Sequence, residues 1–209
     1  MHRIVLIGAS VGGVEALKKI TAALPLDFPA TILIVVHIGA HHSQLPAILQ
    51  QGCRLPVKHA EDGDLLLPGQ VLIAPPDRHL TVQNQDGVPR ARLWFGPKEK
   101  HTRPAIDPLF RSAAAAFDGR VIATILTGFL DDGTAGLQAV KACGGYAIAQ
   151  DPNEAQAPDM PANAIASVAM DQVLRLGEIA PALTALVDER VKIGLPRALM
   201  LALPCARTD

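Results

Sequence analysis

Short runs of apolar residues alternate along the chain with longer amphipathic segments. The short runs are rich in β-branched residues and predict strands at 3–8, 31–36, 71–74, 121–126, 146–149 and near 173–174. The amphipathic segments predict helices at about 13–23, 43–51, 107–117, 135–142 and 177–190. Because strands that alternate with helices usually lie parallel, the pattern predicts an α/β fold: a doubly wound, mostly parallel sheet with flanking helices in three layers.

Local signals add a hairpin and two helix caps to this pattern. The dipeptide Asp86-Gly87 separates two further apolar runs, at 80–82 and 90–94, and predicts one antiparallel hairpin. Ser43 is the expected N-cap of the second helix, and Asp107 that of the third.

The chain shows no internal repeat and no low-complexity linker. We therefore expect one domain over residues 1–190, followed by a C-terminal tail at 191–209 that could be helical. An apolar run at 199–203 has no place in the strand and helix alternation. It is a candidate surface for packing on the domain, on a second copy of the chain, or on a regulatory protein.

Composition narrows the classes of partner. The 209 residues are 49% hydrophobic and 19% charged, which excludes a disordered chain, and the net charge of −1 gives no basic surplus for nucleic acid or anionic lipid. The aliphatic run at 32–36 is far shorter than the roughly 18 residues of a membrane span, so no membrane insertion is expected. Three widely spaced cysteines, an odd number, and no cleavable leader predict a cytoplasmic protein.

Three predicted strands end in side chains that together could form a catalytic relay. Ser10 follows the first strand in a glycine-rich turn, His37 ends the second, and Asp132 follows the strand at 121–126. The carboxyl ends of parallel strands share one edge of a sheet, where ligands bind in open α/β folds. A serine, a histidine and an acid at that edge are the parts of a Ser-His-Asp relay, which needs neither metal nor cofactor.

Each of these features also has an ordinary alternative. A glycine-rich turn after a first strand more often cradles a phosphate or a dinucleotide, although the second strand here lacks the acid that would bind a ribose. His37 could be a hydrogen-bonded structural residue, and Asp132 could belong to a turn and helix cap. His37, His41 and His42 contain an i, i+4 pair, but no acid lies between them as in a zincin helix, so no metal site is expected.

A series of motifs in one order resembles the catalytic domain of the chemotaxis protein-glutamate methylesterases, the CheB family. The motifs are Gly8-Ala9-Ser10-Val11-Gly12-Gly13, a strand ending in His37, Glu61-Asp62-Gly63-Asp64, Pro68-Gly69, Ile73-Ala74-Pro75-Pro76-Asp77-Arg78-His79-Leu80, Arg103 to Ser112, Leu126-Thr127-Gly128, Asp132-Gly133, Gly144-Gly145, Ala149-Gln150-Asp151 and Met160-Pro161. The resemblance extends from residue 3 to about residue 186.

The resemblance implies a role for each site residue. Ser10 is then the nucleophile, His37 the general base and acid, Asp132 the residue that orients the imidazole, and the backbone N–H of Phe129 a donor to the oxyanion. The implied reaction is hydrolysis of glutamate γ-methyl esters on chemoreceptors or another protein, with glutamine deamidation as a second activity. No metal or cofactor is implied.

The sequence departs from the family pattern at several positions. Val11 stands where relatives commonly carry threonine, His37-Ile38-Gly39 replaces His-Met-Pro, and Phe129-Leu130 replaces Met-Gly. The first strand begins at residue 3, so we expect a stand-alone catalytic domain without a receiver domain. Two alternatives remain: a catalytically weak module that binds a receptor or other protein partner, and a nucleotide-binding protein.

Overall fold

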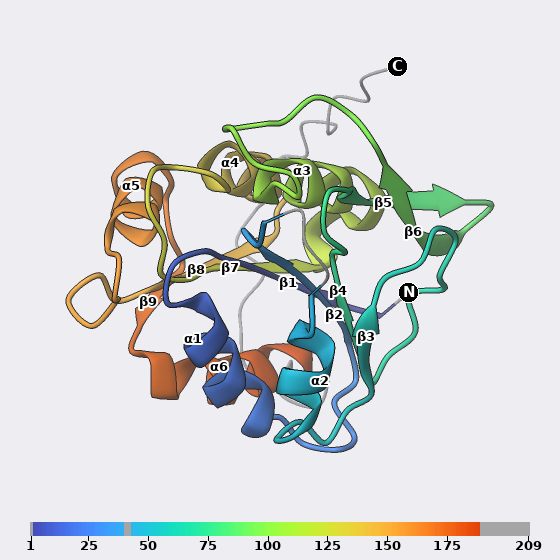
Figure 1. The fold of residues 1–209 in the computed structure, drawn as a ribbon, viewed down its shortest axis with the longest axis horizontal. Coiled ribbons are helices and arrows are strands. Elements are labelled where there is room, and N and C mark those ends of the chain that lie inside the picture. Colours follow the sequence, from blue (N-terminus) through green and yellow to red (C-terminus); the bar gives the residue numbers. More distant parts are fainter. Residues whose placement is uncertain (1, 40–42, 189–209) are drawn as a thin grey trace.

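A seven-stranded parallel sheet forms the centre of the protein (Figure 1). The computed structural model describes residues 2–39 and 43–188. The sheet has the order β3-β4-β2-β1-β7-β8-β9. Its strands are β1 (Ile4–Ala9), β2 (Thr31–Val36), β3 (Val57–His59), β4 (Gln70–Ile73), β7 (Val121–Ile125), β8 (Tyr146–Gln150) and β9 (Gln172–Leu174). All pairings within it are parallel.

Helices cover both faces of the sheet, as Figure 1 shows. One face carries α1 (Gly13–Ala22), α2 (Leu45–Gln50) and α6 (Leu176–Val187). The other face carries α3 (Ile106–Phe117), α4 (Thr134–Ala142) and α5 (Asp159–Ser167). A single 3₁₀ turn, η1 (Asp118–Arg120), joins α3 to β7. The predicted three-layer, doubly wound fold is therefore confirmed.

The core lies on both sides of the sheet because alternate residues of each strand point to opposite faces. In β1, Ile4 and Leu6 pack under α3, whereas Val5 and Ile7 pack against the α1 and α6 layer. All four side chains are fully buried. This arrangement explains why the central strands read as continuous apolar runs rather than as alternating patterns.

The predicted hairpin is also confirmed. Strands β5 (His79–Gln85) and β6 (Val88–Trp94) form a separate two-stranded antiparallel sheet. The turn residues Asp86 and Gly87 have positive φ angles of 53° and 82°, as a tight two-residue hairpin turn requires. The hairpin packs on α3, where the Val82 N–H donates to the Ser112 hydroxyl at 3.0 Å.

Two elements were not predicted. Strand β3 has only three residues and lies at the edge of the sheet, so its pattern is too short to carry a periodic signal. Helix α5 contains Pro161 in its first turn and presents small residues to the core, with Met160 and Ala164 buried. Its packing against α4 and β8, rather than a strong amphipathic pattern, accounts for the helix.

The two predicted caps need correction. The second helix begins at Leu45 rather than at 43, with the Ser43 hydroxyl accepting the N–H of Leu45 at 3.2 Å. Asp107 is not the N-cap of α3, because the helix starts at Ile106. The Asp107 carboxylate instead points inward and accepts the N–H of Gly136 at 2.6 Å.

Some predictions fall outside the described residues. The tail at 191–209, with its apolar run at 199–203, belongs to this group. So do His41 and His42. Within residues 2–39 and 43–188, no helix is both long enough and apolar enough to cross a membrane.

Candidate active site

The candidate site lies where the sheet changes its direction of winding. β1 is flanked by β2 on one side and by β7 on the other, and the connections after β1 and after β7 run toward opposite edges of the sheet. The carboxyl ends of the two strands around such a switch point leave a crevice in which α/β proteins bind ligands. Ser10 follows β1, His37 follows β2, and the loop 126–133 follows β7.

Ser10 is held in a tight turn between β1 and α1. Its N–H donates to the carbonyl of Thr127 at 2.9 Å, and its own carbonyl accepts the N–H of Gly13 at 2.8 Å. Gly12, with φ of 78°, closes the turn in the left-handed region that glycine adopts readily. The backbone of the turn is thereby fixed, so the direction of the Ser10 hydroxyl depends only on the side-chain rotamer.

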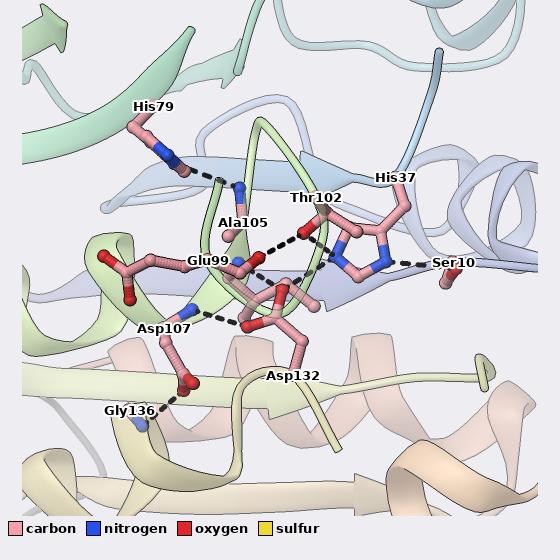
Figure 2. A network of polar contacts seen from close by, with 10 residues as sticks. Ser10, His37, His79, Glu99, Thr102, Ala105, Asp107, Asp132 and Gly136 are labelled. Atoms are coloured by element: carbon pink, nitrogen blue, oxygen red, sulfur yellow. Dashed lines mark hydrogen bonds and ion pairs between the residues drawn. The ribbon is translucent and has the colours of Figure 1, made fainter. Parts of the chain in front are cut away.

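Ser10, His37 and Asp132 form one hydrogen-bonded chain (Figure 2). The Ser10 Oγ lies 3.2 Å from Nδ1 of His37, and Nε2 of the same ring lies 2.7 Å from Oδ2 of Asp132. Because the carboxylate accepts the Nε2 proton, the neutral ring presents the lone pair of Nδ1 to the serine hydroxyl. The structure thus brings together the three residues that the sequence singled out.

The Asp132 carboxylate is buried at the N-terminus of α3. Besides the His37 ring, its oxygens accept the backbone N–H of Ile106 at 2.7 Å and of Asp107 at 3.1 Å. These two N–H groups belong to the first turn of the helix, where a negative charge is stabilised by unpaired donors and by the helix dipole. Asp132 therefore supplies the cap that Asp107 was expected to supply, from 25 residues further along the chain.

Asp107 lies next to this centre but does not contact the His37 ring. The pKa of its carboxyl group is raised to about 6, chiefly by burial and also by the nearby charge of Asp132, while the hydrogen bond from the Gly136 N–H acts in the opposite direction. An acid with a raised pKa holds its proton more tightly when folded, so the folded state loses stability as the pH rises from about 4 to about 6.

Asp107→Asn is expected to remove this pH dependence. The amide oxygen can still accept the Gly136 N–H, but no buried charge forms at neutral pH. We compare the free energy of unfolding of the variant with that of the wild type at each pH by urea denaturation. The difference between the two proteins should shift in favour of the variant by on the order of 2 kcal/mol from pH 4 to pH 7.5. Asp86→Asn, at an exposed turn residue, is the matched control and should leave the pH profile unchanged. Parallel profiles for wild type and Asp107→Asn would contradict the assignment.

Thr127 and Gln150 are buried residues of the site that sequence reasoning did not single out. The Thr127 hydroxyl donates to the carbonyl of Val11 at 2.9 Å and accepts the N–H of Ala157 at 2.8 Å, which links the serine turn to the loop before α5. The Gln150 side chain accepts the Thr127 N–H at 3.0 Å. Their signal in the sequence was their position at the ends of strands on the active edge, within the motifs Leu126-Thr127-Gly128 and Ala149-Gln150-Asp151.

Gly128 lies directly against Ser10. A Cβ at this position would come within 2.7 Å of the Ser10 Cβ and would also collide with the sulfur of Met160. Real Cβ atoms do not approach so closely, so a side chain here forces either the serine turn or α5 to move. Only glycine permits this packing.

Gly128→Ala is therefore expected to displace the nucleophile. A shift of about 1 Å at a reacting group can lower the rate about 100-fold, and we expect a loss of that size in kcat together with about 1–3 kcal/mol of stability. Gly177→Ala is the matched control, because nothing lies within 4 Å of its Cβ position in α6. A Gly128→Ala enzyme with wild-type kcat would show that the serine turn tolerates the displacement.

Phe129 and Leu130 follow Gly128 and lie at the surface, with 55% and 61% of each residue exposed. Among the described residues, no acceptor is recorded for the Phe129 N–H. Leu130 has φ of 65°, in the left-handed region, and its carbonyl accepts the side-chain amide of Asn163 at 2.8 Å. The loop thus keeps a conformation that suits glycine, although leucine occupies the position.

No group of three or more histidine, cysteine, aspartate or glutamate side chains gathers into a metal-binding arrangement within the described ranges. His37 is engaged by Ser10 and Asp132, and its potential partners His41 and His42 lie outside those ranges. The expectation that the site holds no metal remains a prediction.

Comparison with known proteins identifies the family. The family model of the CheB methylesterases matches residues 5–183. The chain belongs to the CheB methylesterase family. The crystal structure of the Thermotoga maritima CheB methylesterase catalytic domain has the same fold, with a TM-score of 0.87 and 38% identity over 90% of this chain and all of that one. The family assignment replaces the interpretation of the glycine-rich turn as a nucleotide cradle.

Curated relatives carry two activities in their names. A protein-glutamate methylesterase/protein-glutamine glutaminase of Oleidesulfovibrio alaskensis is 40% identical over 183 residues, which are 87% of this chain and 51% of the relative. One from Geobacter metallireducens is 40% identical over 85% of this chain and 49% of its own length. The chain thus spans about half of these CheB relatives. A Leptospira interrogans relative, 37% identical, is instead covered over 92% of its length.

Proposed function

We propose that this protein is a serine hydrolase of the protein-glutamate methylesterase type, which hydrolyses γ-methyl esters of glutamate on a receptor or another protein. The observation that carries the proposal is the hydrogen-bonded chain from Ser10 through His37 to Asp132 at the switch point of a CheB-family sheet. A buried carboxylate and an oriented imidazole are what a serine needs to become nucleophilic at neutral pH.

The acylation half of the reaction follows from the geometry. The Ser10 Oγ attacks the ester carbonyl while Nδ1 of His37 accepts the hydroxyl proton, and Asp132 stabilises the imidazolium that results. The N–H of Phe129 is the proposed donor to the oxyanion, since it follows Gly128, which lies against Ser10. His37 then returns the proton to the departing methoxide, and methanol leaves an acyl-enzyme.

Deacylation repeats these steps with water. His37 accepts a proton from water, the hydroxide attacks the acyl carbonyl, and Ser10 recovers its proton as the glutamate carboxylate leaves. The net change is ester plus water to acid plus methanol, with no cofactor consumed. A glutamine side chain can follow the same path with ammonia as the leaving group, which accounts for the second activity in the names of the relatives.

The surface around Ser10 suits a protein substrate. Val11, Phe129 and Leu130 present large apolar side chains to solvent beside the nucleophile. Apolar side chains clustered at a site commonly mark a surface for another macromolecule. A cytoplasmic location, predicted from the sequence, is compatible with such a substrate and remains a prediction.

The alternative is a catalytically weak module that keeps the fold for protein binding. The substitutions Val11 and Leu130, which depart from the family pattern, are the features that favour it. A binding module has no need to activate Ser10, whereas the proposed enzyme does. Reactivity of Ser10 therefore separates the two functions.

The experiment combines labelling with turnover. Wild-type protein should react covalently with a fluorophosphonate at Ser10, identified by peptide mass spectrometry, and should release methanol from peptides or receptor membranes that carry glutamate γ-methyl esters. Chelator in excess should leave the rate unchanged. Absence of both labelling and methanol release would favour the binding module, and chelator sensitivity would restore a metal site to consideration.

A further inference from the structure

A cavity adjoins the active site at the His37 ring. It has a volume of about 240 Å³ and is lined by residues 37–39, Asp77 and residues of the segment 98–104, which connects β6 to α3. The Thr102 hydroxyl in this lining lies 3.4 Å from Nε2 of His37, as Figure 2 shows. A group bound in the cavity would therefore lie across the imidazole ring from Ser10.

The cavity wall carries one ion pair, between Arg103 and Asp77. The Arg103 guanidinium donates to Asp77 from Nη2 at 2.5 Å and from Nε at 2.8 Å, and to the Gly96 carbonyl from Nη1 at 2.6 Å. The Phe95 ring packs on its face, 3.7 Å from the guanidinium carbon. Arg103 and Asp77 thus neutralise each other and leave no free guanidinium fork for a ligand.

Lys98 carries the positive charge in the cavity lining that no ion pair in the described part of the chain neutralises. Its side chain is exposed, and within the described residues it forms no ion pair. Lys100, two residues further, is paired with Asp131 at 2.6 Å. A single unpaired lysine is ordinary on an open surface, but here it borders a concavity that also includes the catalytic histidine. The cavity therefore carries a net positive charge at neutral pH.

We propose that this cavity binds a carboxylate side chain of the substrate protein, with Lys98 as its counter-ion. The inference rests on the proposed function and assigns a specificity to it: esters that have an acidic neighbour one helical turn away are preferred. Side chains at i and i+4 of a helix lie on one face with their Cβ atoms about 5–6 Å apart, and two glutamate side chains that diverge from there can extend one to Ser10 and the other past the imidazole to the cavity. A single negative charge fits better than a dianionic phosphate, because with Arg103 paired to Asp77 only the charge of Lys98 remains to balance it.

The test uses two helical peptides that differ only in charge. Both carry one glutamate γ-methyl ester; one has glutamate four residues before and four residues after the ester, and the other has glutamine at both positions. Wild-type enzyme should prefer the glutamate peptide about three- to tenfold in kcat/KM, with the difference in KM, as for a partly exposed ion pair.

Variants of Lys98 test whether this lysine causes the peptide preference. Lys98→Gln should bring the ratio of the two kcat/KM values close to one, and Lys98→Glu should reverse it. Lys19→Glu, a charge reversal at an exposed lysine in the last turn of α1, is the matched control and should keep the wild-type ratio. Circular dichroism establishes that each variant is folded.

The outcomes separate this inference from the proposed function. Equal hydrolysis of both peptides by the wild type, or an unchanged preference in Lys98→Gln, would overturn the inference and leave the function intact. Failure to hydrolyse either peptide would overturn the function, and the inference with it. Inhibition by inorganic phosphate at constant ionic strength, abolished in Lys98→Gln without any peptide preference, would assign a phosphate site in place of the carboxylate site.

Discussion

Ser10→Ala is expected to abolish ester hydrolysis, with kcat falling about 10⁶-fold, as when the nucleophile of a well-studied triad is removed. The hydroxyl contacts His37 at 3.2 Å and is the only serine oxygen recorded in hydrogen-bond contact with the ring among the described residues. The Thr102 hydroxyl also lies near the ring, 3.4 Å from Nε2, but Nε2 is bound to Asp132 and offers that hydroxyl no lone pair. Methanol release from a γ-methyl ester peptide, followed at saturating substrate, measures the effect.

His37→Gln should give a loss of similar size, because without the base the serine stays protonated. Ser167→Ala, at an exposed serine at the end of α5, is the matched control and should retain full activity. Neither active-site variant should unfold the protein. A Ser10→Ala enzyme that retained even 1% of the rate would place the chemistry at another residue.

Asp132→Asn is expected to damage both activity and stability. The carboxylate accepts three hydrogen bonds, from His37, Ile106 and Asp107, and has no donor of its own. An asparagine side chain has one oxygen and one NH₂ group, so in either orientation the NH₂ faces an N–H donor. Where the NH₂ takes the position of Oδ2, the ring either loses its partner or adopts the wrong tautomer, which costs about 10⁴-fold in comparable triads.

The loss of stability follows from the same contacts. Leaving a buried donor of the α3 N-terminus without an acceptor costs about 1–3 kcal/mol, which urea denaturation would detect. Asp131→Asn is the matched control, since this neighbour pairs with Lys100 at the surface and should contribute less than about 1 kcal/mol. Wild-type activity in Asp132→Asn would mean that the imidazole is oriented by another group, with Thr102 the nearest candidate.

In the proposed mechanism, the position of Asp132 couples folding to catalysis. The carboxylate that orients His37 also caps α3, and α3 in turn packs on β1, the strand that carries Ser10. Mutations that weaken the start of this helix should therefore lower activity as well as stability. Asp107, whose pKa is raised to about 6 by burial beside this cap, adds a dependence on pH to the same region.

The sequence by itself determined the fold class and the three principal side chains of the site. Continuous β-branched runs separated by amphipathic segments leave few alternatives to a parallel sheet between helices, and parallel strands place their carboxyl ends at one edge. Ser10 and His37 each follow a strand directly, and Asp132 lies in the loop after a third strand, so their proximity could be expected before their distances were known.

The tertiary structure decided which partner each polar group takes. The sequence offers Asp107 as the local cap of α3, yet the first-turn N–H groups bind Asp132, because the loop after β7 brings that carboxylate to the helix while Asp107 faces Gly136. Likewise, the roles of Thr127 and Gly128 arise from contacts with Val11, Ala157 and Met160 across long stretches of sequence.

The physical reason is that hydrophobic periodicity and tertiary contacts act over different distances along the sequence. Hydrophobic periodicity acts over one strand or helix at a time and is visible in a window of about a dozen residues. Hydrogen-bond partners, the burial that shifts a pKa, and the charge left unpaired at Lys98 depend on segments that meet only after the sheet has formed. The cavity beside His37 is of this second kind, since its lining joins residues that follow three different strands.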